Sequence, residues 1–464
     1  MQPFIEEMKK LLPLHDKAIG GRRPKARPRN VTYYKKSISM SVKLRLIIMN
    51  FLQFAVWGSY LTSMGTYLAS AGMASNIGLF YAMQGIVSLF MPALIGIIAD
   101  RWIEAQRLLG ICHGLAALFM FGAGYYAMTA GDTVAFAPLF TLYALSVAFY
   151  MPTIALANSV AYSALEKSNL DPVRAFPPIR VWGTVGFICA MLVCDFAGFQ
   201  TGYAQFMQCG VIGIVLAVYA FTLPQCPIAG HSAKRGVVDA LGLRAFTLFR
   251  DRRMAIFFIF SMLLGVSLQI TNGFANPFLT SYRDVPEYMS TFGANHANAL
   301  ISLSQISETL CILLIPFFMK RYGIKRVMVI SMLAWVGRFG LFGLGNPGGG
   351  VWMFILSMII YGVAFDFFNI SGSLFVNEQT DVEIRSSAQG LFMMMTNGIG
   401  ATIGTLGAQA VVNRFVYNGS QGVDMIAGWQ TSWLIFAAYA LVVTILFAIF
   451  FRYKYDPAAA RINK

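Results

Sequence analysis

The sequence reads Phe318-Met-Lys-Arg-Tyr-Gly-Ile-Lys-Arg326 between two long apolar stretches, and this basic turn has a counterpart earlier in the chain. The counterpart, Gly96-Ile-Ile-Ala-Asp-Arg-Trp102, also follows an apolar stretch. Both are imperfect forms of the pattern G-x-x-x-D-R-x-G-x-R/K-R/K. The earlier turn lacks the later glycine, and the later turn has Lys320 where the aspartate would stand. The repetition indicates two structurally related halves.

The apolar stretches around these turns are long enough to cross a membrane. A transmembrane helix needs about 20 apolar residues, and the sequence contains twelve such stretches. A barrel would instead show alternating strands of about 10 residues, so we predict an all-α integral membrane protein. The predicted spans are residues 44–69, 77–98, 108–128, 134–163, 179–199, 204–223, 254–280, 299–319, 326–344, 351–376, 386–413 and 429–451.

The composition agrees with a membrane protein and excludes several other classes. Of 464 residues, 57% are hydrophobic and 12% are charged, whereas about 25% are charged in a typical soluble domain. The formal net charge of +15 comes from basic residues in short connections, which is not the pattern of a nucleic-acid-binding face. The cysteines show no spacing typical of a metal site. We therefore expect no nucleic acid partner and no metal.

The positions of Lys and Arg predict the orientation of the chain. Basic residues accumulate in the connections 99–107, 164–178, 224–253 and 320–325 and near both termini, whereas the opposite side carries only Arg283 and Arg414. Cytoplasmic loops are the ones enriched in Lys and Arg. Both termini are therefore expected to be cytoplasmic.

The longest internal hydrophilic connection divides the twelve spans into two groups of six. We expect an N-terminal six-helix bundle at residues 40–223, a cytoplasmic linker at 224–253 and a C-terminal six-helix bundle at 254–464. Residues 1–39 are basic and lack the apolar core of a signal peptide. They are interpreted either as a basic tail or as sequence upstream of a biological start at Met40.

Charged residues inside the spans are the main functional candidates, because each costs about 2.5 to 3.5 kcal/mol near the bilayer centre. Glu308 lies in the eighth span and Asp366 in the tenth, and the nearby cations are Arg180 and Arg338. A carboxyl group whose exposure to water and to an arginine changes can also change its proton occupancy, as proton coupling requires. The alternative is a permanent structural ion pair. Asp195, near the end of its helix, is expected to be hydrated.

Amide and aromatic residues accompany these charges at helical spacing. Gln305 shares a helix face with Glu308, and Gln269 shares one with Asn272. Amides can pair with the edge of a heterocyclic base, aromatic rings offer stacking faces, and charged groups bind hydroxyls. The amides therefore favour a nucleoside over a bare sugar, although each could also be a hydrogen bond between helices. The other members are the stripe Arg180, Thr184 and Phe187 and the group Tyr361, Phe365 and Asp366.

The paired turns and the twelve spans resemble the major facilitator superfamily. That family has two pseudo-symmetric six-helix halves that enclose a site near the membrane midplane. The resemblance implies alternating access, in which the halves rock about a central cavity.

Within that superfamily, the sequence resembles the bacterial nucleoside:proton symporters from about Met40 to the end of the last span. The matching runs include Phe51-Leu-Gln-Phe-Ala-Val-Trp-Gly-Ser59, Phe176-Pro-Pro-Ile-Arg-Val-Trp-Gly-Thr184 and Ser304-Gln-Ile-Ser-Glu-Thr309. The resemblance implies a substrate cavity formed by Arg180, Thr184, Phe187, Gln269, Asn272, Gln305, Glu308, Tyr361, Phe365 and Asp366.

These observations together predict a proton-coupled nucleoside importer of the bacterial inner membrane. The expected partners are a purine or pyrimidine nucleoside, protons and membrane lipid, and the expected functional unit is a monomer. Glu308 and Asp366 are the candidates for proton coupling, with the proton as coupling ion and no other cofactor. No enzymatic activity is expected. A proton-coupled sugar or glycoside symporter and an uncoupled nucleoside facilitator stay open as alternatives.

Overall fold

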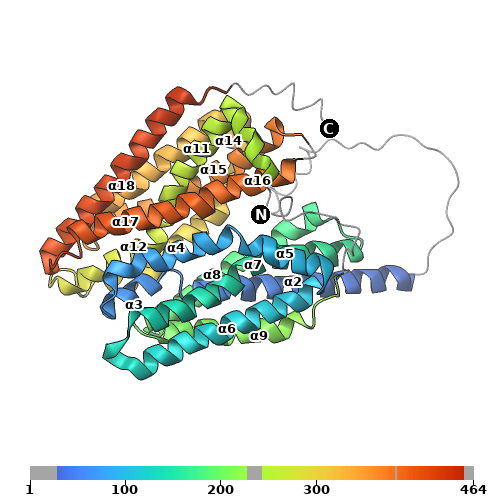
Figure 1. Ribbon diagram of the computed structural model, residues 1–464, viewed down its shortest axis with the longest axis horizontal. Coiled ribbons are helices and arrows are strands. Elements are labelled where there is room, and N and C mark those ends of the chain that lie inside the picture. Colours follow the sequence, from blue (N-terminus) through green and yellow to red (C-terminus); the bar gives the residue numbers. More distant parts are fainter. Residues whose placement is uncertain (1–28, 227–242, 382–383, 454–464) are drawn as a thin grey trace. The chain divides into compact units, whose positions relative to one another are not determined.

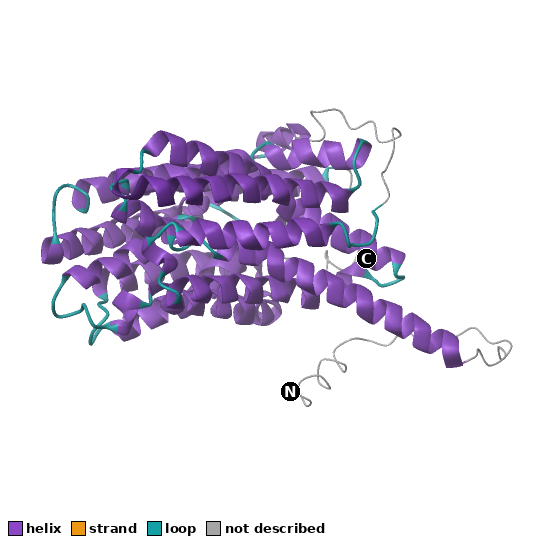
Figure 2. Ribbon diagram, turned by 90° about the horizontal axis from the view of Figure 1, so that it is seen from below, coloured by secondary structure: helices purple, strands orange, loops and turns teal. Residues whose placement is uncertain are grey.

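The computed structural model describes residues 29–226, 243–381 and 384–453, and these residues form helices joined by short loops, without a β-strand (Figure 2). The contacts divide the chain into two compact units, Met1–Ser41 and Val42–Lys464. Apart from the first part of α2, everything discussed below lies in the second unit. The prediction for residues 1–28 falls outside the described residues, as does the part of the predicted linker at residues 227–242.

The helices of the N-terminal half are blue to green in Figure 1, and they follow the first six predicted spans. The first span is divided between α2 and α3, and the second between α4 and α5, which meet at an angle of 40°. Pro92 lies at the start of α5. Because proline has no N–H to continue a helix, it favours a break at this point. The bounds are α2 Arg29–Gly58, α3 Met64–Ser70, α4 Ile77–Ser88, α5 Met91–Arg101, α6 Ala105–Ala130, α7 Phe136–Lys167, α8 Pro172–Phe196 and α9 Ala204–Ala220.

The helices of the C-terminal half, coloured up to red in Figure 1, follow the other six predicted spans. Helix α14 covers the eighth and ninth spans but is interrupted at Gly323, which has φ 73° and ψ 168°. Glycine adopts this positive φ without steric cost, so the basic turn found in the sequence is the kink. The bounds are α11 Arg252–Leu268, α12 Ile270–Ser281, α13 Phe292–Asn295, α14 Ala297–Leu344, α15 Val351–Gln379, α16 Arg385–Met393, α17 Ala401–Phe415 and α18 Gly422–Phe450, with a π-helical segment at Met394–Gly400.

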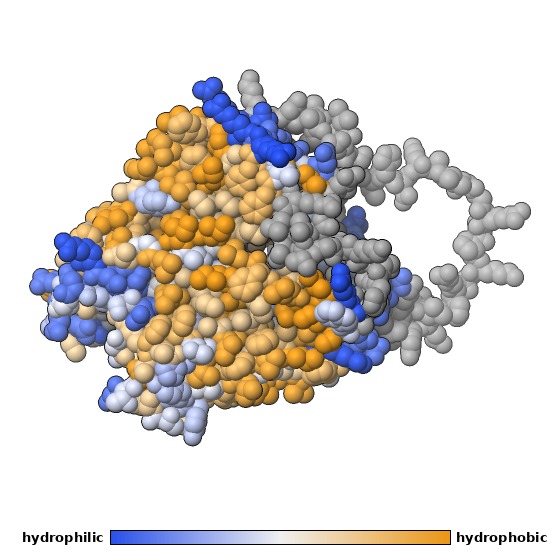
Figure 3. Space-filling view, viewed as in Figure 1, coloured by the Kyte–Doolittle hydropathy of each residue, from blue (hydrophilic) through white to orange (hydrophobic). Residues whose placement is uncertain are grey.

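The described helices are those of a multi-pass membrane protein. By length and hydropathy, seven segments can cross a membrane, or eight if the bent pair α4 and α5 forms one span. The other predicted spans coincide with the divided helices α2–α3 and α16–α17 and with the shorter α9. Figure 3 shows apolar side chains over most of the visible helix surface and hydrophilic ones gathered towards the helix ends. The all-α prediction is confirmed for the described residues, and the count of twelve spans stays a prediction.

Two glycines bring α2 and α8 into close contact in the N-terminal half. A Cβ atom at Gly58 would overlap the backbone of Phe187, and one at Gly186 would overlap the backbone of Phe51. Small residues allow helix backbones to approach closely in membranes. The packing therefore fixes Phe187, a predicted site residue, against α2.

A third glycine sets the contact between α14 and α15 in the C-terminal half. A Cβ atom at Gly362 would lie 2.5 Å from the backbone oxygen of Ser307. Gly362 follows Tyr361, and Ser307 precedes Glu308. The two helices are thus closely packed at the level of the predicted site.

The two halves are joined by buried polar side chains, called here the polar seam: Thr62, Thr66, Asp195, Asn276 and Asn298. Thr62 Oγ1 donates to Asn298 Oδ1 at 2.8 Å, and Thr66 Oγ1 donates to Asn276 Oδ1 at 2.6 Å. Asn276 Nδ2 also donates to Asn298 Oδ1, at 2.7 Å. Side chains from α3 and its N-terminal flank are therefore bonded to α12 and to the start of α14.

The expectation that Asp195 is hydrated is wrong. Its side chain is 0% exposed, and its carboxylate accepts hydrogen bonds from Gln200 and, at 2.8 Å, from the backbone N–H of Ala299 in the other half. His296 Nδ1 lies 3.5 Å from the same carboxylate. Asp195 is buried because the start of α14 covers it and supplies the donors that water would otherwise provide.

Candidate functional site

Arg180 of α8 forms the cationic part of the predicted site in the N-terminal half. Its guanidinium carbon lies 3.9 Å from the centroid of the Phe54 ring on α2. Arg180 also interacts electrostatically with Tyr150 and Tyr162 on α7 and with Glu308 on α14. Because Glu308 belongs to the C-terminal half, this electrostatic interaction of Arg180 links the two halves.

Thr184 and Phe187 follow Arg180 on the same face of α8. The Phe187 ring meets Trp57 edge-on, with ring centroids 6.4 Å apart, and Trp57 also contacts Tyr150 at 6.1 Å. The indole nitrogen of Trp57 is buried and has no hydrogen-bond partner among the described residues. An unpaired indole N–H at this place is a donor available to a ligand.

A buried hydrogen-bond network holds α2 behind Phe54. Gln53 Nε2 donates to Thr153 Oγ1 at 2.8 Å, and the hydroxyl of Tyr150 donates to the backbone oxygen of Gln53 at 2.9 Å. His113 Nε2 lies 2.7 Å from Gln53 Oε1. Since the Gln53 amide nitrogen points at Thr153, its oxygen accepts, and His113 Nε2 must carry the hydrogen. The network fixes the segment of α2 on which Arg180 rests.

Two carboxyl groups form the acidic part of the site in the C-terminal half. Glu308 on α14 interacts electrostatically with Arg180, and Asp366 on α15 interacts with Glu308. Asp366 is 5% exposed, and its Oδ2 has no hydrogen-bond partner among the described residues. Interacting carboxyl groups bind protons as a pair. This electrostatic pairing of two carboxyl groups therefore suits a group that takes up and releases a proton.

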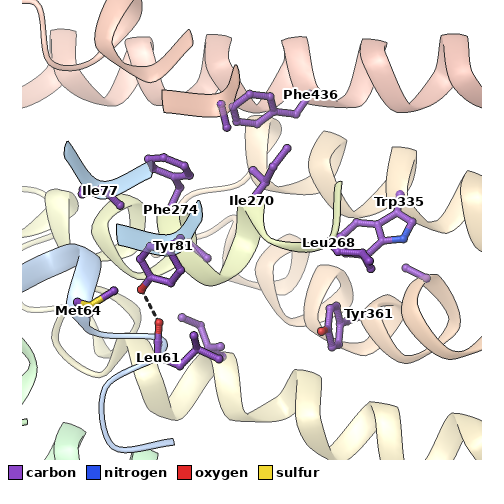
Figure 4. Close-up of a cluster of buried hydrophobic side chains, with 14 of the residues drawn as sticks. Leu61, Met64, Ile77, Tyr81, Leu268, Ile270, Phe274, Trp335, Tyr361 and Phe436 are labelled. Carbon is purple, nitrogen blue, oxygen red and sulfur yellow. Dashed lines mark hydrogen bonds between the residues drawn. The ribbon is translucent and has the colours of Figure 1, made fainter. Parts of the chain in front are cut away.

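An aromatic group lies next to the carboxyl groups. Tyr361 and Phe365, one turn apart on α15, stack with ring centroids 5.6 Å apart and an interplanar angle of 20°. Tyr361 is in electrostatic range of both Glu308 and Asp366. Figure 4 shows Tyr361 at the edge of a buried apolar cluster that also contains Leu268 and Ile270. These two residues flank Gln269 in the sequence, so the break between α11 and α12 lies in the same region.

The predicted amides are positioned in two ways. Asn272 Nδ2 donates to Gln269 Oε1 at 2.5 Å, so this pair on the α11–α12 break is bonded together. Gln305, one turn before Glu308, has a buried Oε1 without a partner among the described residues. A paired amide still offers one donor and one acceptor, and an unpaired oxygen offers an acceptor. All three amide side chains are half-buried and retain hydrogen-bonding capacity.

The structure thus brings Arg180, Glu308 and Asp366 into one electrostatic group, with Tyr361 and Phe365 beside it. Three neighbours of the predicted residues were not identified from the sequence: Phe54, Trp57 and Trp335. Phe54 and Trp57 lie in the stretch Phe51–Ser59, at a helical spacing that would place them on one face of α2. That spacing was the signal that could have identified them.

Comparisons with known proteins identify the family of the chain. Residues 40–456 match the family described as Nucleoside H+ symporter. The chain is 46% identical over 419 residues to Nucleoside permease NupG of Escherichia coli (strain K12), which covers 90% of this chain and 97% of that protein. It is 45% identical over 421 residues to Xanthosine permease of the same organism, covering 90% and 98%.

Solved structures show the same relationship. The crystal structure of nucleoside transporter NupG has a TM-score of 0.81 at 46% identity, over 89% of this chain and 100% of that chain. A POT family peptide transporter, 14% identical, has a TM-score of 0.66 over 90% of this chain and 98% of that chain, and shares the fold alone. The resemblance seen in the sequence is confirmed, and with it the expectation of a transporter. The chain belongs to the nucleoside H+ symporter family.

Proposed function

We propose that this protein imports nucleosides together with protons across the bacterial inner membrane by alternating access. The family match and the relatives named as nucleoside and xanthosine permeases support this function. The observation that carries it is the electrostatic interaction of Arg180, in one half, with Glu308, in the other. An interaction between the halves changes in strength whenever the halves move. The charge state of Glu308 is thereby coupled to the side of the membrane on which the site is open.

The proposed architecture is twelve spans in two pseudo-symmetric six-helix bundles, at residues 40–223 and 254–464, joined by a linker at 224–253. The correspondence of every predicted span with a helix or a divided helix supports this count. The concentration of Lys and Arg on one side supports cytoplasmic termini. The proposed functional unit is a monomer, because each chain carries both halves of the site.

The polar seam supports a conformation that is closed on the outer side. With cytoplasmic termini, Thr62, Thr66 and Asn298 lie towards the outer ends of their helices. On α7, towards the opposite end, an open hollow of about 460 Å³ is lined largely by polar residues. Its lining, all of it on α7, is Ala155, Asn158, Ser159, Tyr162, Ser163 and Glu166. In this proposal, the cytoplasmic opening of the transport path lies on this side.

The proposed roles follow from the chemistry of each group. Amides pair with the base edge and the ribose, aromatic rings stack with the base, and charged groups bind hydroxyls. Within the described parts of the chain, Arg180 is the one cation that interacts with Glu308, so a single proton on the Glu308 and Asp366 pair neutralises the group of three. A neutral centre lowers the cost of movement within the bilayer. The amides are Gln269, Asn272 and Gln305, the stacking and shape residues are Phe187, Tyr361 and Phe365, and Thr184 completes the α8 face.

Uptake of labelled uridine into proteoliposomes, with and without an imposed pH gradient, tests this function. Accumulation above equilibrium only with the gradient supports symport, and equilibration alone would indicate an uncoupled facilitator. Glu308→Gln is expected to keep uridine binding but to abolish accumulation driven by pH. Competition by adenosine but not by free sugars distinguishes a nucleoside carrier from a sugar or glycoside symporter.

A further inference from the structure

Arg338 of α14 is a buried cation to which the proposed transport cycle gives no role. Its side chain is 2% exposed. Its Nη1 donates to the backbone oxygen of Ser357 at 2.8 Å and to Oγ of Ser304 at 3.4 Å, both of them neutral acceptors. An arginine inside a membrane span is unfavourable unless its position serves a purpose. The contacts of its guanidinium face indicate that purpose.

The guanidinium carbon of Arg338 lies 4.4 Å from the centroid of the Tyr361 ring, within the range of a cation–π interaction. Trp335 meets the same ring edge-on, at 6.0 Å and 89° (Figure 4). Phe365 stacks with Tyr361 from one turn further along α15. Three neighbours therefore restrict the rotation of the Tyr361 ring.

These contacts connect the buried Arg338, through the Tyr361 ring, to Phe365, which lies in the predicted substrate site. Tyr361 is buried, whereas Phe365 is half-buried and is followed directly by Asp366. Since stacked rings restrict each other's orientation, the orientation of Tyr361 also sets that of Phe365. Arg338 can therefore act on the part of the site that a base would touch without touching the base.

We propose that Arg338 is a positioning residue for nucleoside recognition, which holds Tyr361 by its guanidinium face and thereby orients Phe365 as the stacking surface for the base. The inference rests on the proposed function, since it assigns a role within nucleoside binding. It requires arginine rather than lysine. The planar guanidinium can lie over a ring while its edge donates to Ser357, whereas an ammonium group is a compact, strongly hydrated point charge.

The reciprocal bond between α14 and α15 makes this arrangement rigid. Ser357 Oγ donates to the backbone oxygen of Arg338 at 3.0 Å, while Arg338 donates to the backbone oxygen of Ser357. The two hydrogen bonds hold both the backbone and the guanidinium of Arg338 in place relative to α15. The guanidinium is thus anchored to the helix that carries the ring it contacts.

Uptake kinetics of Arg338→Lys in proteoliposomes, with adenosine and uridine as substrates, test the inference. A purine offers a larger stacking face than a pyrimidine. We therefore expect KM to rise about 10-fold for adenosine and about 3-fold for uridine, while the maximal rate per folded transporter stays within about 2-fold. Arg414→Lys, at an exposed position on α17, is the matched control and should leave both KM values unchanged. A purely structural role would lower the maximal rate for both substrates and leave the ratio of their KM values intact, which would overturn the proposal.

A second variant keeps the test valid if Arg338→Lys does not fold. Tyr361→Leu removes the ring through which Arg338 acts, so it should produce the same larger loss for adenosine than for uridine. In the double variant, the effects should not add, because both changes interrupt one path. Equal KM changes for the two substrates in Tyr361→Leu, or fully additive effects in the double variant, would contradict the inference. If the unmodified protein transports no nucleoside, the proposed function itself fails, and the two failures are thereby distinguished.

Discussion

The carboxylate of Asp195 on α8 accepts a hydrogen bond of 2.8 Å from the backbone N–H of Ala299, at the start of α14 in the opposite half. The first N–H groups of a helix have no partner within the helix, and a carboxylate there is further favoured by the helix dipole. Gln200 donates to the same carboxylate. One side chain of the N-terminal half therefore caps a helix of the C-terminal half.

Asp195→Asn is predicted to weaken the hydrogen bonds that join the two halves at the polar seam. Gln200 and Ala299 donate to different oxygens of the Asp195 carboxylate, and the amide replaces one of these oxygens with a donor, so one of the two hydrogen bonds is lost. A hydrogen bond to a charged group contributes about 1.5 to 3 kcal/mol. Amide hydrogen exchange at the start of α14 should become at least about 10-fold faster than in the unmodified protein. Asp424→Asn, at an exposed position on α18, serves as the control and should leave this exchange unaltered. Unchanged exchange in Asp195→Asn would show that the cap does not hold the halves together.

Arg180→Lys is predicted to weaken uridine binding while keeping the positive charge. The lysine loses the planar group that lies 3.9 Å from the Phe54 ring, and a cation–π contact contributes about 0.5 to 2 kcal/mol, so KM should rise about 2- to 30-fold. Phe54→Leu should produce a rise of similar size. Uptake of labelled uridine measures both. If Phe54→Leu leaves KM unchanged, the ring does not position Arg180.

Trp57→Phe is predicted to raise the uridine KM because it removes the unpaired indole donor but keeps an aromatic ring against Phe187. One net hydrogen bond contributes about 0.5 to 1.5 kcal/mol, which corresponds to about 2- to 12-fold in KM. Trp102→Phe, at an exposed position outside the site, is the control. An unaltered KM in Trp57→Phe would indicate that the indole N–H does not reach the substrate.

Gly362→Ala is predicted to destabilise the contact between α14 and α15. Its methyl group would lie 2.5 Å from the backbone oxygen of Ser307, and overpacking of this kind costs about 1 to 3 kcal/mol. Thermal unfolding in detergent should therefore begin at a lower temperature. Gly340→Ala is the matched control on α14, because a Cβ atom there meets nothing within 4 Å. Equal unfolding temperatures for both variants and the unmodified protein would refute the prediction.

Hydropathy predicted where the helices lie, because the need for about 20 apolar residues is a property of the chain itself. It did not predict where they break. The first span is interrupted between Gly58 and Met64, and Gln269 separates α11 from α12. At the first break, turn hydrogen bonds such as that from the Ser63 N–H to the backbone oxygen of Tyr60 satisfy the local backbone, and the Ser63 hydroxyl donates to Gln205 Oε1 on α9. A hydropathy window averages over such residues and cannot locate these breaks.

The site could be predicted in its residue types but not in all its contacts. The shared face of Gln269 and Asn272 followed from their spacing, and the structure gives the two amides a common hydrogen bond. The environment of Asp195 was mispredicted because its partner Ala299 lies 104 positions away. Nothing in the local pattern around Asp195 reveals a partner supplied by the other half.

The tight fit of Gly362 against Ser307 has a mechanical consequence for coupling. Close packing of α14 on α15 beside Glu308 and Asp366 restricts sliding of the two helices. We therefore expect the spacing between the two carboxyl groups to be preserved when the bundle moves. Under the alternating access proposed above, the distance from Arg180 on α8 to this pair is what changes. In that proposed cycle, the carboxyl pair carries more uncompensated negative charge whenever Arg180 withdraws, which favours proton uptake by the pair.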